Sequence, residues 1–341
     1  MKTAIILFNL GGPDGPGAVK PFLFNLFSDP AIIGLPQPLR WLVAKLIAGR
    51  RAPVARTIYD HMGGRSPILP NTEDQARALE AALGPEFKCF IAMRYWRPRA
   101  RDQVAAVKAW QPDRILLLPL YPQFSTTTTG SSVREWQREA RRAGLDAPTT
   151  TLCCYPANEG FVEAVVDGVR AGLARMDRAR PRVLFSAHGL PKKIVSAGDP
   201  YQGQVEQSVA AVLARLALPD LDWVICYQSR VGPLEWIGPS TEAEVIRAGA
   251  DGVPLLVVPI AFVSDHSETL VELDIEYREL ARQKGVPDYV RAPTVGATPS
   301  FIAGLVDEVR RAMASGRPIV SGEGPRLCPG DRVGCPCGET R

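Results

Sequence analysis

Two of the three histidines in the chain, His188 and His266, lie near the ends of short apolar runs. Four acidic side chains accompany the second histidine, at Asp265, Glu268, Glu272 and Glu276. On an α-helix, the four-residue steps between the glutamates place them along one face, where like charges repel unless water or a cation lies between them. Imidazole and carboxylate groups together suit proton acceptance and loose binding of divalent ions such as Fe²⁺. A structural role for His188 and a solvated acidic face for Glu272 and Glu276 are the alternatives.

A second set of reactive side chains lies at the C-terminal end. Three of the seven cysteines fall within the last 14 residues, at Cys328, Cys335 and Cys337. In a reducing compartment, such clustering is better explained by a metal or redox group than by structural disulfides. A zinc site, unrelated thiols and a disulfide stay as alternatives.

The elements that must position these residues are short strands alternating with helices. Apolar runs rich in β-branched residues occur at 3–9, 88–93, 114–120, 149–153, 182–186, 222–228, 253–262 and 288–291. This alternation is typical of parallel sheets covered by helices, and 341 residues exceed what one core usually covers. We therefore predict an α/β fold of two lobes, each with a four-stranded parallel sheet, at residues 1–155 and 156–314, with a C-terminal extension at 315–341.

The distinctive segments follow the ends of predicted strands. Ligands in open α/β sheets bind beyond the carboxyl ends of the strands, so we expect the loops after residues 9, 120, 186 and 259 to face one another across an interdomain cleft. The apolar, proline-broken segment 21–50 fits neither core. It is either a pair of ordinary helices on a sheet or an apolar lip over a flat ligand that also contacts a bilayer surface, aided by Arg40, Lys45, Arg50 and Arg51.

Several function classes are disfavoured by composition and motifs. The net charge is +4, and basic and acidic residues are interleaved, which disfavours a nucleic-acid partner. Neither a Gly-x-x-x-x-Gly-Lys loop nor a Gly-x-Ser-x-Gly elbow occurs, so nucleotide binding and serine hydrolysis are disfavoured. The N-terminal apolar run is too short for a signal peptide, and no run is long enough to span a membrane. We expect a cytoplasmic protein.

Four segments, taken in order, resemble the motifs of ferrochelatases, which insert Fe²⁺ into a porphyrin to make haem. They are YPQFS at 121–125 with TTGSS at 128–132, FSAHGLP at 185–191, YQSRVGP at 227–233 with WIGP at 236–239, and SDHSETLVELDIEY at 264–277. The resemblance extends from about residue 9 to about residue 309. It implies two Rossmann-like lobes around a cleft.

The resemblance also implies roles for individual residues. His188 corresponds to the catalytic histidine that accepts a pyrrole proton, and Glu268 to its carboxylate partner across the ring. The residues implied in handling the substrate iron are His188, Glu268, His266, Asp265, Glu272 and Glu276. Those implied in porphyrin binding are Leu10, Arg94, Ser131, Ser132, Ser229 and Trp236.

The tail resembles that of family members with a [2Fe–2S] cluster, which needs four ligands. Cys328, Cys335 and Cys337 supply three thiolates. The animal-type arrangement takes its fourth ligand from the position of Thr126 and therefore does not apply. Some bacterial members use a cysteine after the fourth strand, which is Cys154 here, with Cys153 as the alternative.

The expected reaction is insertion of Fe²⁺ into protoporphyrin IX, a lyase reaction that forms protohaem, releases two protons and completes haem biosynthesis. The apolar lip favours protoporphyrin over coproporphyrin III, whose two extra carboxylates need cationic partners. Coproporphyrin III chelation and a non-catalytic porphyrin or haem carrier are the alternatives. The apolar lip favours peripheral contact with the inner face of the cytoplasmic membrane, and the resemblance implies a homodimer.

Overall fold

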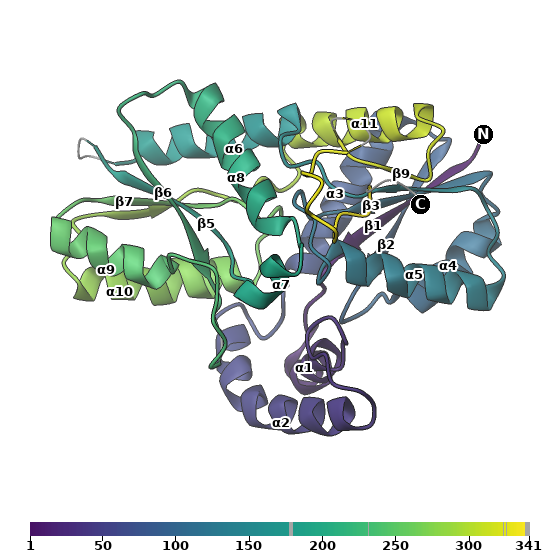
Figure 1. Ribbon diagram of the computed structural model, residues 1–341, viewed down its shortest axis with the longest axis horizontal. Helices are drawn as coiled ribbons and strands as arrows, with labels where there is room; N and C mark the ends of the chain where they lie inside the picture. Colours follow the sequence, from purple (N-terminus) through teal and green to yellow (C-terminus); the bar gives the residue numbers. More distant parts are fainter. Residues whose placement is uncertain (177–179, 231, 323, 325, 338–341) are drawn as a thin grey trace.

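Two parallel β-sheets form the framework in the computed structural model, which describes residues 1–176, 180–230, 232–322, 324 and 326–337 (Figure 1). The first sheet has the order β2-β1-β3-β4-β9, with β1 (Thr3–Asn9), β2 (Phe87–Met93), β3 (Arg114–Pro119), β4 (Thr149–Leu152) and β9 (Ile319–Val320). The second has the order β6-β5-β7-β8, with β5 (Arg182–His188), β6 (Asp222–Gln228), β7 (Leu255–Pro259) and β8 (Tyr289–Arg291). The predicted α/β fold with two parallel-sheet lobes is confirmed.

The first sheet contains a fifth strand that was not predicted. Strand β9 lies in the C-terminal segment and pairs with β4 through Thr151 with Ile319 and Leu152 with Val320. Two residues are too few to produce a recognisable apolar period, so sequence patterning does not detect this strand. Part of the C-terminal segment is thereby built into the first lobe, while the domain limits themselves stay a prediction.

Helices cover both faces of the sheets (Figure 1). Those of the first lobe are α3 (Ile68–Leu83), α4 (Ala100–Trp110) and α5 (Thr129–Ala143). Those around the second are α6 (Glu159–Ala174), α7 (Lys192–Ser196), α8 (Tyr201–Leu216), α9 (Thr241–Asp251) and α10 (Arg278–Gln283). Helix α11 (Pro299–Ala314) contacts both α3 and α6 and so bridges the lobes.

One buried core runs through both lobes. Ile5 and Leu118 of the first sheet, Phe185 and Val258 of the second, and Phe301 of α11 belong to a single apolar cluster and are at most 2% exposed. Protein interiors are close-packed and resist deformation. This shared core therefore fixes the strand ends of the two lobes relative to each other.

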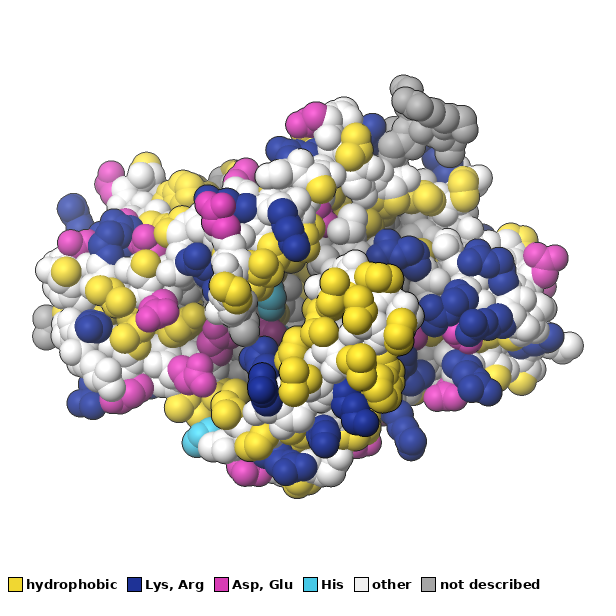
Figure 2. Space-filling model, turned by 60° about the horizontal axis from the view of Figure 1, so that its bottom comes forward, with side chains coloured by type: hydrophobic (Ala, Val, Ile, Leu, Met, Phe, Trp, Pro, Cys, Tyr) yellow, Lys and Arg dark blue, Asp and Glu magenta, His cyan; other side chains and the backbone are white. Residues whose placement is uncertain are grey.

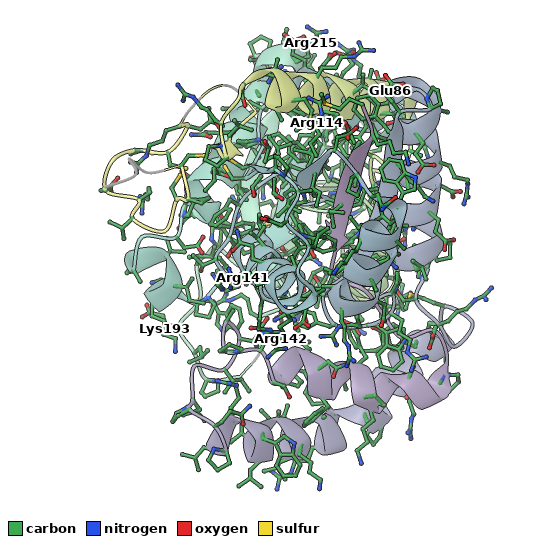
Figure 3. The ribbon with its side chains drawn as sticks, turned by 90° about the vertical axis from the view of Figure 1, so that its right-hand side faces the viewer. Glu86, Arg114, Arg141, Arg142, Lys193 and Arg215 are labelled. Atoms are coloured by element: carbon green, nitrogen blue, oxygen red, sulfur yellow. The ribbon has the colours of Figure 1, made fainter. Side chains whose placement is uncertain are left out.

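A separate layer below the lobes consists of the 3₁₀-helix Pro16–Ala18, α1 (Val19–Phe27) and α2 (Leu39–Asp60), as Figures 1 and 3 show from two sides. Its inner side is buried and includes Phe22, Ala48 and Tyr59. Residues 28–50 of this part of the chain expose six large apolar side chains, which we call the lip patch: Ile32, Leu35, Leu39, Trp41, Leu42 and Leu46. In Figure 2, a hydrophobic surface bordered by Lys and Arg faces the viewer on this side. Segment 21–50 thus has both a packed and an exposed apolar face.

No helix within the described ranges has the length and apolar character needed to cross a bilayer.

Candidate active site

His188 is the last residue of β5 and lies at the carboxyl end of the second sheet. Its Nδ1 lies 2.6 Å from the carbonyl oxygen of Gly189. Because a carbonyl only accepts hydrogen bonds, Nδ1 carries the proton of the neutral ring and Nε2 keeps its lone pair. Nε2 lies 3.7 Å from Oε1 of Glu268, and the His188 side chain is 40% exposed. His188 is therefore a base that can exchange protons with water.

Glu268 is the first residue of a π-helix, Glu268–Tyr277, where an α-helix was predicted. Such helices are rare and frequently occur at functional sites. The Glu268 carboxylate lies between two imidazoles, with Oε2 3.8 Å from Nε2 of His266. Burial raises the pKa of Glu268, but the charges of the His188 and His266 rings in their protonated forms, together with the contact to His266, outweigh burial and lower it to about 2. The carboxylate is therefore anionic at neutral pH, and its buried Oε2 has no hydrogen-bond partner among the residues that the structure describes.

His266 supports this carboxylate from the protein interior. The ring is buried, and its Nδ1 lies 3.0 Å from the carbonyl oxygen of Ser264. Burial lowers the pKa of His266, but the negative charge of Glu268 and, to a smaller extent, Asp265 raise it above its ordinary value. A charged His266 and an anionic Glu268 thus stabilise each other.

The three other carboxylates predicted to handle iron have different surroundings. Glu272 is partly buried, and burial together with the charge of Glu268 raises its pKa. Glu276 is exposed. Asp265 forms an ion pair with Arg291 at 3.1 Å. Within the described residues, no three His, Cys, Asp or Glu side chains are arranged to hold a metal ion as they stand. The structure therefore brings His188, Glu268 and His266 together, with Glu272 and Asp265 close enough to affect their charges and Glu276 exposed.

Comparisons with known proteins identify the family. Residues 2–313 match the family model described as Ferrochelatase. The chain belongs to the ferrochelatase family. It is 54% identical to a ferrochelatase of Phenylobacterium zucineum and 52% identical to one of Caulobacter vibrioides, in each case over 99% of this chain and 98% of the relative. The fold is similar to that of SirB from Bacillus subtilis with Fe³⁺, with a TM-score of 0.55, 14% identity and coverage of 92% of this chain and 96% of that chain.

Two of the predicted porphyrin-binding residues of this ferrochelatase lie beside His188. A Cβ atom on Gly189 would approach the Trp236 ring to 3.3 Å, which places Trp236 against the residue after His188. Ser229 directly follows β6 and donates to Glu272. Leu10 lies elsewhere, where it packs against the buried side of the α1–α2 layer. Figure 2 shows a recess between this layer and the second lobe, with a histidine at its floor.

The predicted porphyrin-binding residues Arg94 and Ser131 are engaged within the protein. Arg94 donates to Asp29 and Ser131 at 2.8 Å each and to Glu135 at 3.1 Å. The Ser131 hydroxyl also donates to Asp29 at 2.5 Å, and Ser132 is buried. Because Asp29 lies just after α1, these contacts tether the α1–α2 layer to the first lobe.

Two residues of this ferrochelatase site were not predicted from the sequence. Asp29 was detectable as a lone acid within an otherwise apolar segment. Gln228 lies inside the YQSRVGP motif, and its side chain donates to the backbone carbonyl of Glu268 at 2.8 Å. The sequence signal that could have indicated Gln228 is a polar residue at the end of an apolar strand, because a buried polar group needs a hydrogen-bond partner.

Five cysteines lie together where the C-terminal segment meets the end of β4. They are Cys153, Cys154, Cys328, Cys335 and Cys337. Sγ of Cys153 lies 3.3 Å from Sγ of both Cys154 and Cys337. Hydrogen bonds from the thiols of Cys328 and Cys337 lower the pKa of Cys335 and favour its thiolate. Gln204 Nε2 lies 3.3 Å from Sγ of Cys154 and 3.1 Å from Sγ of Cys328. All of these cysteines are free, so the ferrochelatase has a set of soft donors of the kind that iron–sulfur clusters use.

Proposed function

We propose that the protein inserts Fe²⁺ into protoporphyrin IX, as a lyase that completes haem biosynthesis. The observation that carries this proposal is the 3.7 Å separation of His188 Nε2 and Glu268 Oε1, which sets a base against an anion. A chelatase needs both: a base for the pyrrole protons and a negative charge that attracts the cation.

In the proposed reaction, two pyrrole N–H bonds break and iron–nitrogen bonds form in their place. The lone pair of His188 Nε2 accepts one pyrrole proton and passes it to water, because the side chain is 40% exposed. The same base then removes the second proton. The carboxylate of Glu268, whose Oε2 lies 3.8 Å from Nε2 of His266, supplies negative charge to the approaching Fe²⁺. His266, whose pKa is raised mainly by Glu268, lies behind that carboxylate.

The lip patch supports protoporphyrin as the substrate. Its six exposed apolar side chains match a porphyrin that carries vinyl groups, whereas coproporphyrin III has two additional carboxylates. Arg94 has three acceptors within the protein, so it is not a free partner for such a carboxylate.

We further propose a cytoplasmic protein whose lip patch contacts the inner face of the cytoplasmic membrane. The homodimer stays a prediction that rests on the resemblance alone.

We also propose that Cys154, Cys328, Cys335 and Cys337 hold a [2Fe–2S] cluster, with Cys153 as the alternative fourth ligand. Thiols from two distant segments lie together without a disulfide, which fits the donor set that such a cluster requires. When bound, the cluster supplies a one-electron redox group. Gln204 would donate N–H groups to its thiolates.

The test uses anaerobically purified protein, mixed with Fe²⁺ and either protoporphyrin IX or coproporphyrin III, while loss of the free-base visible bands is followed. We expect protoporphyrin to be metallated faster, and we expect Glu268→Ala to abolish turnover. Faster turnover of coproporphyrin III would reassign the substrate. Porphyrin binding without metallation by Fe²⁺ or Zn²⁺ would contradict the chelatase and favour a carrier.

A further inference from the structure

We infer that Gln228 is a positioning residue that holds Glu268 against His188 without touching the substrate. Gln228 is the last residue of β6 and is fully buried. It is the register partner of His188 in the adjacent strand β5. Its backbone carbonyl accepts a hydrogen bond from the Gly189 N–H at 2.9 Å, which fixes the chain immediately after His188.

The side chain of Gln228 reaches the opposite wall of the site. Its Nε2 donates to the backbone carbonyl of Glu268 at 2.8 Å and to Oε2 of Glu272 at 3.1 Å. Its Oε1 accepts from the Ser186 hydroxyl at 2.8 Å. Because the Glu268 carbonyl only accepts hydrogen bonds, a single orientation of the amide satisfies all three contacts. One residue therefore connects the strand that carries His188 to the helix that carries Glu268.

The contacts of Gln228 lie at the start of the π-helix, which determines the position of Glu268. Glu268 is the first residue of the π-helix, so a hydrogen bond to its carbonyl fixes the start of that helix. Glu272, four residues further along the same helix, accepts hydrogen bonds from the Ser229 N–H at 2.8 Å and the Ser229 hydroxyl at 2.5 Å. Ser229 has a φ of +59°, in the left-handed region. Glu272 thus anchors the corner after Gln228, and its role in handling the substrate iron stays a prediction.

The test compares Gln228→Met with a matched control, Gln123→Met. Gln123 is 2% exposed, and its Nε2 donates to Ser208 Oγ at 2.8 Å and to the Ile260 carbonyl at 3.3 Å, so its replacement also removes buried amide hydrogen bonds. Because a displacement of about 1 Å at a reacting group costs up to about 100-fold in rate, we expect kcat to fall roughly 10- to 100-fold in Gln228→Met. The Kd for protoporphyrin and the kcat of Gln123→Met should stay near parental values.

A second variant and a second readout keep the inference testable. Gln228→Glu retains the size of the side chain and the acceptor for Ser186, but it places a carboxylate against Glu272, and we expect the same selective loss of kcat. NMR signals of the His188 ring should shift in Gln228→Met and stay unchanged in Gln123→Met. This comparison needs no turnover, so it separates failure of the inference from failure of the proposed function on which the inference rests.

Three kinetic results would overturn the role of Gln228. They are near-parental kcat in both Gln228 variants, a loss of kcat no larger than that of Gln123→Met, and a loss confined to porphyrin affinity. Unchanged His188 signals in Gln228→Met would also contradict it.

Discussion

Oε2 of Glu268 lies 3.8 Å from Nε2 of His266, while Nδ1 of His266 faces the Ser264 carbonyl at 3.0 Å. Both ring nitrogens of His266 therefore face acceptors, and only the charged ring, with two N–H groups, matches both. This explains why the pKa of His266 is raised even though burial opposes its charge. Protonation of His266 thus places a positive charge behind the carboxylate that faces His188, and the raised pKa favours this form.

We predict that Glu268→Gln lowers the pKa of His266, because the substitution removes the negative charge that opposes burial. In the parent protein, the raised pKa means that charged His266 contributes stability fully below pH 6.5, and that this contribution is lost as pH rises through the raised pKa. Glu268 contributes stability above pH 4.5, which is lost as pH falls toward 2. An NMR titration of the histidine rings checks the shift, with exposed His61 as internal control. An unchanged His266 titration would show that the two side chains do not interact.

We predict that Asp29→Asn destabilises the protein by about 1–3 kcal/mol, since it weakens a largely buried ion pair while Arg94 keeps Glu135 as a second partner. The Asp29 side chain is only 2% exposed and that of Arg94 12%. The matched control is Asp74→Asn, whose ion-pair partner Arg77 is 67% exposed, and whose loss should cost about 0–1 kcal/mol. Urea unfolding measures both. Equal losses in the two variants would mean that the Asp29 contacts do not tether the α1–α2 layer.

We predict that Cys328→Ser and Cys154→Ser abolish the visible absorption of the iron–sulfur cluster and its bound iron, because each removes one of four thiolates. Cys89→Ser is the matched control, since Cys89 lies in β2 and outside the cysteine group. Cys153→Ser should retain the cluster. The reverse result for Cys153 and Cys154 would make Cys153 the fourth ligand, and retention in Cys328→Ser would remove Cys328 from the ligands. Absence of cluster absorption from the anaerobically purified parent protein would remove the cluster proposal.

We predict that Trp41→Glu weakens binding to phosphatidylglycerol vesicles by roughly tenfold or more, because burial of a large apolar side chain is worth about 1.5–3 kcal/mol. Trp223→Glu is the matched control, since Trp223 on β6 is 43% exposed and Trp41 is 44% exposed. Sedimentation with vesicles measures both variants. Equal weakening by the two substitutions would argue against the lip patch as the membrane-contacting surface.

Local sequence patterns were enough to predict the eight main strands, and contiguous motifs were enough to single out His188 and Glu268. Each of the eight predicted strands exists, because alternating apolar runs and helical periods are properties of neighbouring residues. The motif resemblance led to the ferrochelatase family and to His188 and Glu268, since both residues belong to contiguous motifs. Three features escaped patterning: the two-residue strand β9, the π-helix at Glu268, and Gln228 as a positioning residue.

Tertiary structure decided which polar groups are free. Arg94 pairs with Asp29, which lies 65 residues away in the chain, while its contact with the porphyrin stays a prediction. Glu272 and Glu276 were expected to act alike, yet one is partly buried against Ser229 and the other is exposed. The physical reason is that a hydrogen bond or ion pair depends on distances of a few ångströms between segments far apart in sequence. Packing sets those distances, and no local period encodes them.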